Sequence, residues 1–166
     1  NCDIKDIGGI GILVSPEINT TGFREAGYVD GLSLLYNNIE NTNTMKASGD
    51  ANSAISIQGY HKNIADGYVR HKNITIQGNR FANWGSHAIS VDTAENVKII
   101  DNIFVDAAAY DDERTPIYLA GSKNVEVSGN KFPSQYSGKE AVQIGGVNVK
   151  NVYGQDVGTV KCIADY

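Results

Sequence analysis

Short runs that alternate apolar and polar residues follow one another along the middle of this chain. Residues 73–91, NITIQGNRFANWGSHAISV, contain two such runs, at 74–76 and 89–91, each with the period of two expected of a half-buried strand. Gly78 and Gly85 interrupt the pattern, so neither run extends into a helix. The pattern therefore predicts strands in this part of the chain.

The same plan recurs twice further along, in residues 96–119 and 124–144. Two columns of asparagine mark the repeats: Asn73, Asn96 and Asn124, and Asn79, Asn102 and Asn130. Both columns advance by 23 residues at the first step (73 to 96, 79 to 102) and by 28 at the second (96 to 124, 102 to 130), and the five extra residues fall in the loop at 110–114. Repeats of this length that vary in one loop indicate a solenoid. We predict an all-β, right-handed parallel β-helix of about six coils, with residues 1–166 as one domain.

Such a fold places equivalent residues of successive coils in columns. Three apolar columns are predicted to form the core: Ile55, Ile89, Ile117 and Val142; Ile57, Val91, Leu119 and Ile144; and Phe81, Phe104 and Phe132. One polar column is predicted inside or at a corner, with amides that bond to one another along the stack: Asn37, Asn79, Asn102 and Asn130. This structural role explains these asparagines without catalysis.

Composition agrees with many short strands joined by tight turns. The 166 residues include 18 Gly and 3 Pro, and Gly and Asn tolerate the left-handed backbone conformations that sharp corners require. A net charge of -5 and a pI near 5.1 argue against a nucleic-acid-binding protein, which needs a clustered basic surface. No apolar run is long enough to cross a membrane. We expect neither nucleic acid nor a membrane as a partner.

The two cysteines, Cys2 and Cys162, lie near opposite ends of the chain. Stacked strands advance about 4.8 Å per coil, so these residues should be roughly 20 Å or more apart. A disulfide needs Cα atoms about 4.4–6.8 Å apart. We predict two free, mostly buried thiols.

Outward-facing side chains on successive coils lie at multiples of about 4.8 Å. Paired catalytic carboxyl groups are about 5–5.5 Å apart in retaining glycosidases and about 6.5–9.5 Å apart in inverting ones, close to one and two coils. His87 and Glu140 should lie two coils apart, roughly 10 Å, with the loop 110–114 rooted between them. The predicted catalytic residues are Asp92, Asp112, Glu113 and Glu140. The predicted substrate-binding residues are Trp84, His87, Arg114 and Tyr118.

Several of these residues also have an ordinary structural explanation. The acidic run 111–113 is compatible with a solvated loop or a weak cation site. His87 is compatible with a hydrogen-bonded corner histidine, and Trp84 with packing in a turn. The chain has no Ser-His-Asp spacing, no metal-binding Cys/His cluster and no phosphate-binding Gly loop. We predict no metal site and no cofactor, with calcium at the acidic loop as the alternative.

Two resemblances follow from these residues. Residues 73–81, with their copies beginning at Asn96 and Asn124, resemble the repeats of right-handed parallel β-helix proteins of the pectate-lyase-like group. More narrowly, residues 54–59, 67–70, the coil that begins at Asn73 and residues 115–119 are similar to the later coils of the α-1,3-galactosidases of glycoside hydrolase family 110. These resemblances imply a carbohydrate-active protein that acts on a polysaccharide or oligosaccharide and is secreted, periplasmic or extracellular. In that family the catalytic acids lie in earlier coils, so the resemblance implies a fragment of a longer β-helix that is inactive alone.

Three functions remain open. The leading hypothesis is a glycoside hydrolase, or part of one, in which a carboxyl pair supplies general acid and base catalysis. The second is a polysaccharide lyase or epimerase, for which Arg114 with Asp111 and Asp112 would supply the base and a cation site. The third is a non-catalytic glycan-binding or structural segment such as a trimeric spike. The polar outward positions disfavour the spike: Thr75, Lys98 and Glu126, and Ser56, Ser90 and Gln143.

The first residues, 1–4, already belong to a coil. Uncovered strands of a solenoid expose apolar side chains and unpaired backbone groups. We therefore expect the layer that contains Ile4, Ile10 and Ile12 to be covered by an upstream segment, a separate chain or a second copy of the protein.

Overall fold

The computed structural model describes residues 1–15, 27–44, 53–59, 71–106, 115–134 and 142–145. In these ranges the chain forms strands that pair only in parallel, in three sheets. Sheet A contains β1 (Asp3–Ile7), β4 (Asn38–Thr42), β7 (Arg80–Trp84) and β10 (Ile103–Phe104). Sheet B contains β2 (Ile12–Val14), β5 (Ser53–Gln58), β8 (His87–Asp92), β11 (Ile117–Ala120) and β13 (Val142–Gly145). Sheet C contains β3 (Asp30–Leu35), β6 (His71–Gln77), β9 (Ala94–Ile100) and β12 (Lys123–Ser128).

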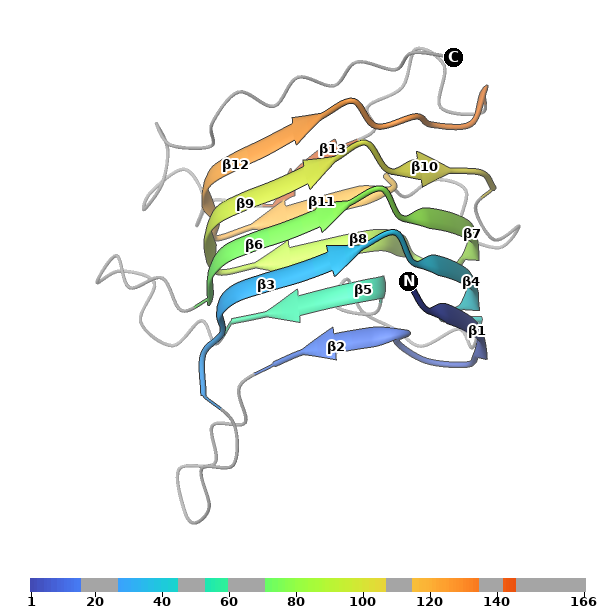
Figure 1. The fold of residues 1–166 in the computed structure, drawn as a ribbon, viewed down its shortest axis with the longest axis horizontal. Helices are drawn as coiled ribbons and strands as arrows, with labels where there is room; N and C mark the ends of the chain where they lie inside the picture. Colours follow the sequence, from blue (N-terminus) through green and yellow to red (C-terminus); the bar gives the residue numbers. More distant parts are fainter. Residues whose placement is uncertain (16–26, 45–52, 60–70, 107–114, 135–141, 146–166) are drawn as a thin grey trace.

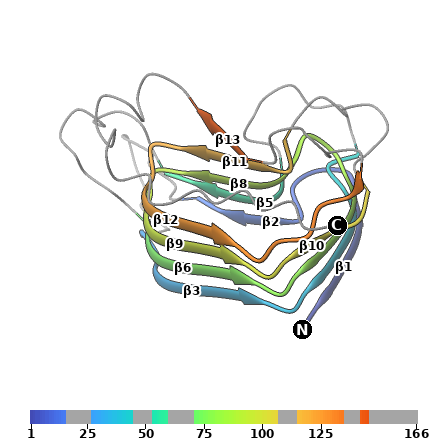
Figure 2. The ribbon, with the colours of Figure 1, turned by 90° about the horizontal axis from the view of Figure 1, so that it is seen from above.

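The chain visits the sheets in a repeating order, from C to A to B and back to C. Each visit adds a strand beside the one laid down a coil earlier, so the strands of a sheet stack along one axis (Figure 1). Seen from above, the three sheets enclose a common interior (Figure 2). The fold is therefore a parallel β-helix, as predicted. Its right-handedness and the count of six coils stay predictions, and the sixth partial coil expected at 147–155 lies outside the described residues.

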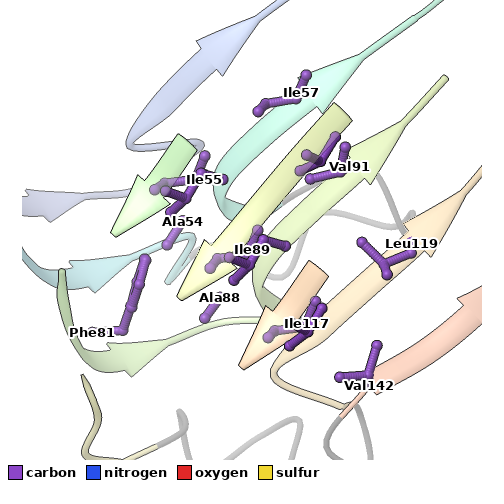
Figure 3. Close-up of a cluster of buried hydrophobic side chains, with 14 of the residues drawn as sticks. Ala54, Ile55, Ile57, Phe81, Ala88, Ile89, Val91, Ile117, Leu119 and Val142 are labelled. Carbon is purple, nitrogen blue, oxygen red and sulfur yellow. The ribbon is translucent and has the colours of Figure 1, made fainter. Parts of the chain in front are cut away.

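The predicted core columns are confirmed by strand register. Ile55, Ile89, Ile117 and Val142 are successive partners, and so are Ile57, Val91, Leu119 and Ile144. Phe104 stacks between Phe81 and Phe132, with ring centroids 5.0 and 4.9 Å away. The members of the first two columns that Figure 3 labels point into one continuous apolar interior. Burial in the middle coils is complete, since Ile55, Ile89 and Ile117 are each 0% exposed.

The predicted asparagine column is also confirmed, and it lies at the corner between sheets C and A. The Oδ1 of Asn79 accepts from both the backbone N–H and the side-chain amide of Asn37, each at 2.9 Å. Asn79 and Asn102 then donate in the same way to the next coil, ending at Asn130. These amides are buried and satisfied, so they tie each coil to the next.

The residue before each of these asparagines has a left-handed backbone. Tyr36, Gly78, Asp101 and Gly129 occupy this position, with φ between 55° and 65°. At Gly78 a Cβ would lie 2.5 Å from two ring carbons of Tyr36, so the corner also needs glycine there because of the neighbouring coil. Along the stack, this corner position is thus occupied alternately by a residue with a side chain and by glycine.

Sheet B departs from simple alternation at one point. The backbone N–H groups of Ala88 and Ile89 both donate to the carbonyl of Pro116, at 2.9 and 3.0 Å, which is the signature of a β-bulge. Both side chains therefore enter the core, where each is 0% exposed (Figure 3). Ala54 and Ile55 in β5 are buried in the same way. The bulge turns the residue before it, His87, to the outer face of the sheet.

Cys2 is free, as expected, but it is exposed, so the prediction of a buried thiol is wrong at this position. The chain begins at the edge of sheet A, where Cys2 precedes a strand with no neighbour on its outer side among the described residues. Cys162 lies outside the ranges described here. Within those ranges, no helix is long and apolar enough to span a membrane.

Candidate functional site

The outer face of sheet B gathers most of the candidate residues that the structure describes. We call it the sheet B face and define it by Ser53, Ser56, Gln58, His87, Ser90, Asp92 and Tyr118. Strand register aligns them in rows across the coils. Ser53 lies beside His87, Ser56 beside Ser90 and then Tyr118, and Gln58 beside Asp92. The β-helix thus brings His87, Tyr118 and Asp92 to one face.

The rings of His87 and Tyr118 stack on each other across adjacent coils. Their centroids are 5.0 Å apart and their planes are inclined by 23°. The Nδ1 of His87 lies 2.6 Å from the carbonyl oxygen of Thr115. Because a carbonyl can only accept, Nδ1 carries the proton in this bond. His87 is 1% exposed and Tyr118 is half-buried, and the imidazole covers one face of the tyrosine ring from the adjacent coil.

Accessibility differs along the sheet B face. Ser56 and Ser90 are 0% and 3% exposed, which leaves the middle of the face closed to a large ligand. Ser53 is also 0% exposed, and its Oγ has no hydrogen-bond partner in the part of the chain described. By contrast Gln58, Asp92 and Tyr118 are half-buried. A ligand could therefore reach the row where the strands end, together with the tyrosine ring.

Asp92 stands at a corner that two neighbouring glycines keep open. Its Oδ1 accepts from the hydroxyl of Thr93 at 2.9 Å. On one side, a Cβ at Gly59 would lie 2.5 Å from the Cβ of Thr93. On the other, a Cβ at Gly121 would lie 3.3 Å from Oδ1 of Asp92. The corner therefore leaves room for the carboxylate and orients it through Thr93.

Trp84 does not lie on this face. It is 1% exposed and packs edge-on against Phe104, with centroids 5.7 Å apart and planes inclined by 78°. The indole belongs to the core beside the phenylalanine stack, so the expectation that it contacts substrate has no support. The alternative explanation, packing in a turn, agrees with its position. Sequence alone could not separate the two because an indole suits both a core and a sugar platform.

The remaining predicted residues, Asp112, Glu113, Arg114 and Glu140, lie outside the described residues. On the part of the sheet B face that the structure describes, Asp92 is the only carboxyl group. A catalytic carboxyl pair would therefore need a second acid from those segments. Among the residues described, no group of three or more His, Cys, Asp or Glu side chains could hold a metal ion. The acidic loop proposed as a calcium site is not among them.

His71 is a buried polar residue that sequence reasoning missed. It is 0% exposed, its Nε2 lies 3.0 Å from the carbonyl of Gln58, and its Nδ1 accepts from the N–H of Val29 at 3.3 Å. Burial lowers the pKa of the imidazole, and the bond to the Gln58 carbonyl opposes that shift only in part. The sequence did contain a signal, because His71 is aligned with the small residue Ala94 of the next coil. A large polar side chain at such a position is expected to need a hydrogen-bond partner.

Comparisons with protein-family models, with curated proteins and with solved structures each return no match to this chain. The resemblances to the pectate-lyase-like group and to glycoside hydrolase family 110 therefore rest on the residues quoted for them. The parallel β-helix rests on the strand pairing itself.

Proposed function

We propose that this chain is part of a carbohydrate-active β-helix and that a glycan binds along the accessible row of the sheet B face. The observation that carries the proposal is the Tyr118 ring, which is half-buried, stacks on His87 of the adjacent coil and lies on the same face as Asp92. Sugar rings present apolar C–H faces that pack on aromatic rings, and their hydroxyls bond to carboxylates and amides. Tyr118 offers an aromatic surface for the sugar ring, and Asp92 and Gln58 offer hydrogen-bonding groups for its hydroxyls.

The chemistry that we propose is glycoside hydrolysis without a cofactor. Asp92 would act with a second acid, for which Glu140, Asp112 and Glu113 are the candidates. A second acid one coil away would favour a retaining mechanism, which needs carboxyl groups about 5–5.5 Å apart, because coils are spaced by about 4.8 Å. A second acid two coils away would favour an inverting mechanism, which needs about 6.5–9.5 Å. A secreted, periplasmic or extracellular location would suit such a substrate.

The test of binding is a screen of the full chain on a glycan array, followed by titration of the best oligosaccharide. Tyr118→Ala should weaken binding by about tenfold or more, since it removes the stacking surface. Tyr118→Phe, which keeps the ring, should retain most of the affinity. Tyr36→Ala is the matched control, because Tyr36 is 60% exposed on a different part of the stack. Equal losses in Tyr118→Ala and Tyr36→Ala would reject the sheet B face as the site.

The test of hydrolysis is separate from the test of binding. Asp92→Asn should abolish turnover of a bound oligosaccharide while changing its affinity only slightly, because the amide keeps the shape and loses the acid. Glu126→Gln is the control, an exposed carboxyl on the outside of sheet C. Turnover that survives in Asp92→Asn would remove this residue from the mechanism. Formation of an unsaturated product with uronate polymers, lost on chelation of calcium, would favour the lyase instead.

A non-catalytic glycan-binding or structural segment is the second candidate. The burial of His87, Ser56 and Ser90 favours it, because these polar groups are withdrawn from any ligand. Glycan binding without turnover, in a chain whose Tyr118→Ala variant loses affinity, would select this function.

A further inference from the structure

Hydrogen-bonded side-chain ladders run along the outside of the stack, and each ends on a carboxylate at the same end. In sheet A, the amide of Asn83 donates to Asn41 at 2.6 Å, and Asn41 donates to Asp6 at 2.8 Å. Beside it, Arg80 donates to Asn38 at 2.9 Å, and Asn38 donates to Asp3 at 3.0 Å.

Sheet C has a ladder of the same kind. Asn96 donates to Asn73 at 3.0 Å, and Asn73 donates to Asp30 at 2.6 Å. An amide both donates and accepts, so it can continue a ladder in either direction, whereas a carboxylate only accepts. Asp3, Asp6 and Asp30 are exposed, and a carboxylate can accept more bonds than the one that each receives from its ladder.

The three acids belong to the strands that form this end of the structure. We call β1, β2 and β3 the head layer, since each is the terminal strand of its sheet among the described residues. The apolar side chains of the head layer that reach the core are only partly buried: Ile4, Ile12, Val14, Leu32 and Leu34. Their partners one coil further in, Ile39, Ile55, Ile57, Ile74 and Ile76, are at most 1% exposed.

The head layer also carries three of the six large exposed apolar side chains in the described part of the chain, and a fourth follows it directly. Ile7, Leu13 and Leu35 are 37%, 54% and 36% exposed, and Tyr36 directly after β3 is 60% exposed. Among the described residues, the surface therefore combines a strand edge without a pairing strand, a half-covered core and a set of carboxylates. An unpaired edge of this kind is a template for a further strand.

We propose that the head layer binds a further coil of parallel β-helix, whose strand over β1 carries basic or amide side chains facing Asp3 and Asp6. Apolar side chains of that coil would complete the burial of Ile4, Ile12 and Leu32. A head-to-head second copy is a poorer occupant, because it would place Asp3, Asp6 and Asp30 of one molecule against those of the other in a chain of net charge -5.

The chain supplies a probe in its own sequence. A copy of residues 79–100, placed directly before Asn1, would form a coil of the natural spacing, with Asn1 in the place of Asp101 and Cys2 in that of Asn102. In this register the copied Arg80 faces Asp3 and the copied Asn83 faces Asp6, because those residues already share columns. The donor-bearing extension therefore tests the proposed chemistry directly.

The matched control is the same extension with Arg80→Asp and Asn83→Asp in the copied segment only. Hydrogen exchange measured at β1 and β2 should be slower by about tenfold in the donor-bearing protein than in the unextended chain, since covered edge amides are protected. The acid-bearing extension should give little protection. Asp3→Asn with Asp6→Asn in the head layer should remove the difference between the two extensions. Exchange at β8 serves in every protein as the measure of an intact core.

Three results would overturn the proposal. The first is equal protection by the donor-bearing and acid-bearing extensions, which would show that the carboxylates do not favour a coil with basic or amide side chains. The second is protection by neither extension while β8 remains protected. The third is an unextended chain that sediments as a dimer and dissociates on Leu13→Ser, which would assign the head layer to a second copy.

Discussion

The head layer and the middle coils use the same kinds of residue and reach different degrees of burial. Ile12 in β2 is half-buried, whereas Ile55 and Ile89, the next residues of its column, are 0% exposed. In a solenoid each layer touches only its neighbours, so a layer with one neighbour buries less than a layer with two. Position in the stack, more than residue type, therefore sets how much each isoleucine stabilises the protein.

The largest expected effect compares two isoleucines of one column. Ile89→Ala should lower the free energy of unfolding by about 2–5 kcal/mol, because it leaves a cavity in a closed core. Ile12→Ala should cost less than half as much, since part of that side chain already contacts water. Urea denaturation of both variants measures the difference. Equal costs would mean that the head layer is covered in solution.

The second comparison sets the buried asparagine ladder against an exposed one. Asn79→Ala removes the acceptor of two bonds from Asn37 and leaves buried donors unpaired, which should cost about 1–3 kcal/mol. Asn83→Gly removes an exposed ladder residue and keeps its left-handed backbone, with φ of 49°, accessible. Its cost should stay within about 0.5 kcal/mol in the same denaturation experiment. A larger loss in Asn83→Gly would show that the exposed ladders also hold the coils together.

His71 joins the head side of the stack to the middle coils and should make this junction sensitive to pH. Its pKa is lowered in the folded protein, so the unfolded chain takes up a proton first as the pH falls. The stabilisation is complete above the ordinary histidine pKa of about 6.5 and is lost as the pH falls from there through the folded pKa. Stability measured against pH should show this loss in the native protein, and His71→Asn should flatten the curve over that window. A curve of unchanged shape in the variant would assign the effect to other groups.

The smallest expected effect concerns the ion pair that links the head layer to the next coil. The Nζ of Lys5 lies 3.8 Å from Glu40, and both side chains are substantially exposed. Lys5→Gln should change the free energy of unfolding by no more than about 0.5 kcal/mol. A loss that exceeded this value and disappeared in high salt would show that charge, rather than apolar packing, attaches the head layer.

Sequence reasoning succeeded where a structural position repeats. Spacing alone predicted the aromatic column of Phe81, Phe104 and Phe132 and the ladder through Asn79 and Asn102. Successive coils of a solenoid place residues at equivalent positions next to one another. It was less successful for residues that occur once. Trp84 is aligned with Thr42 and His71 with Ala94, so no repeated residue type in their columns indicated whether they lie inside or outside.

The sequence by itself determined the strand period, the coil length and the register, because these depend only on the regular spacing of apolar residues, asparagines and turns. The tertiary structure alone decided which polar side chains share the sheet B face. His87 faces outward because two backbone N–H groups, of Ala88 and Ile89, bond to one carbonyl of Pro116 in the next coil. A bulge inserts one residue and so reverses the alternation of side chains before it. The outward position of His87 therefore depends on a hydrogen bond between Ala88 and Pro116, which are 28 residues apart in the chain. The alternation of apolar and polar residues in the sequence does not encode this bond.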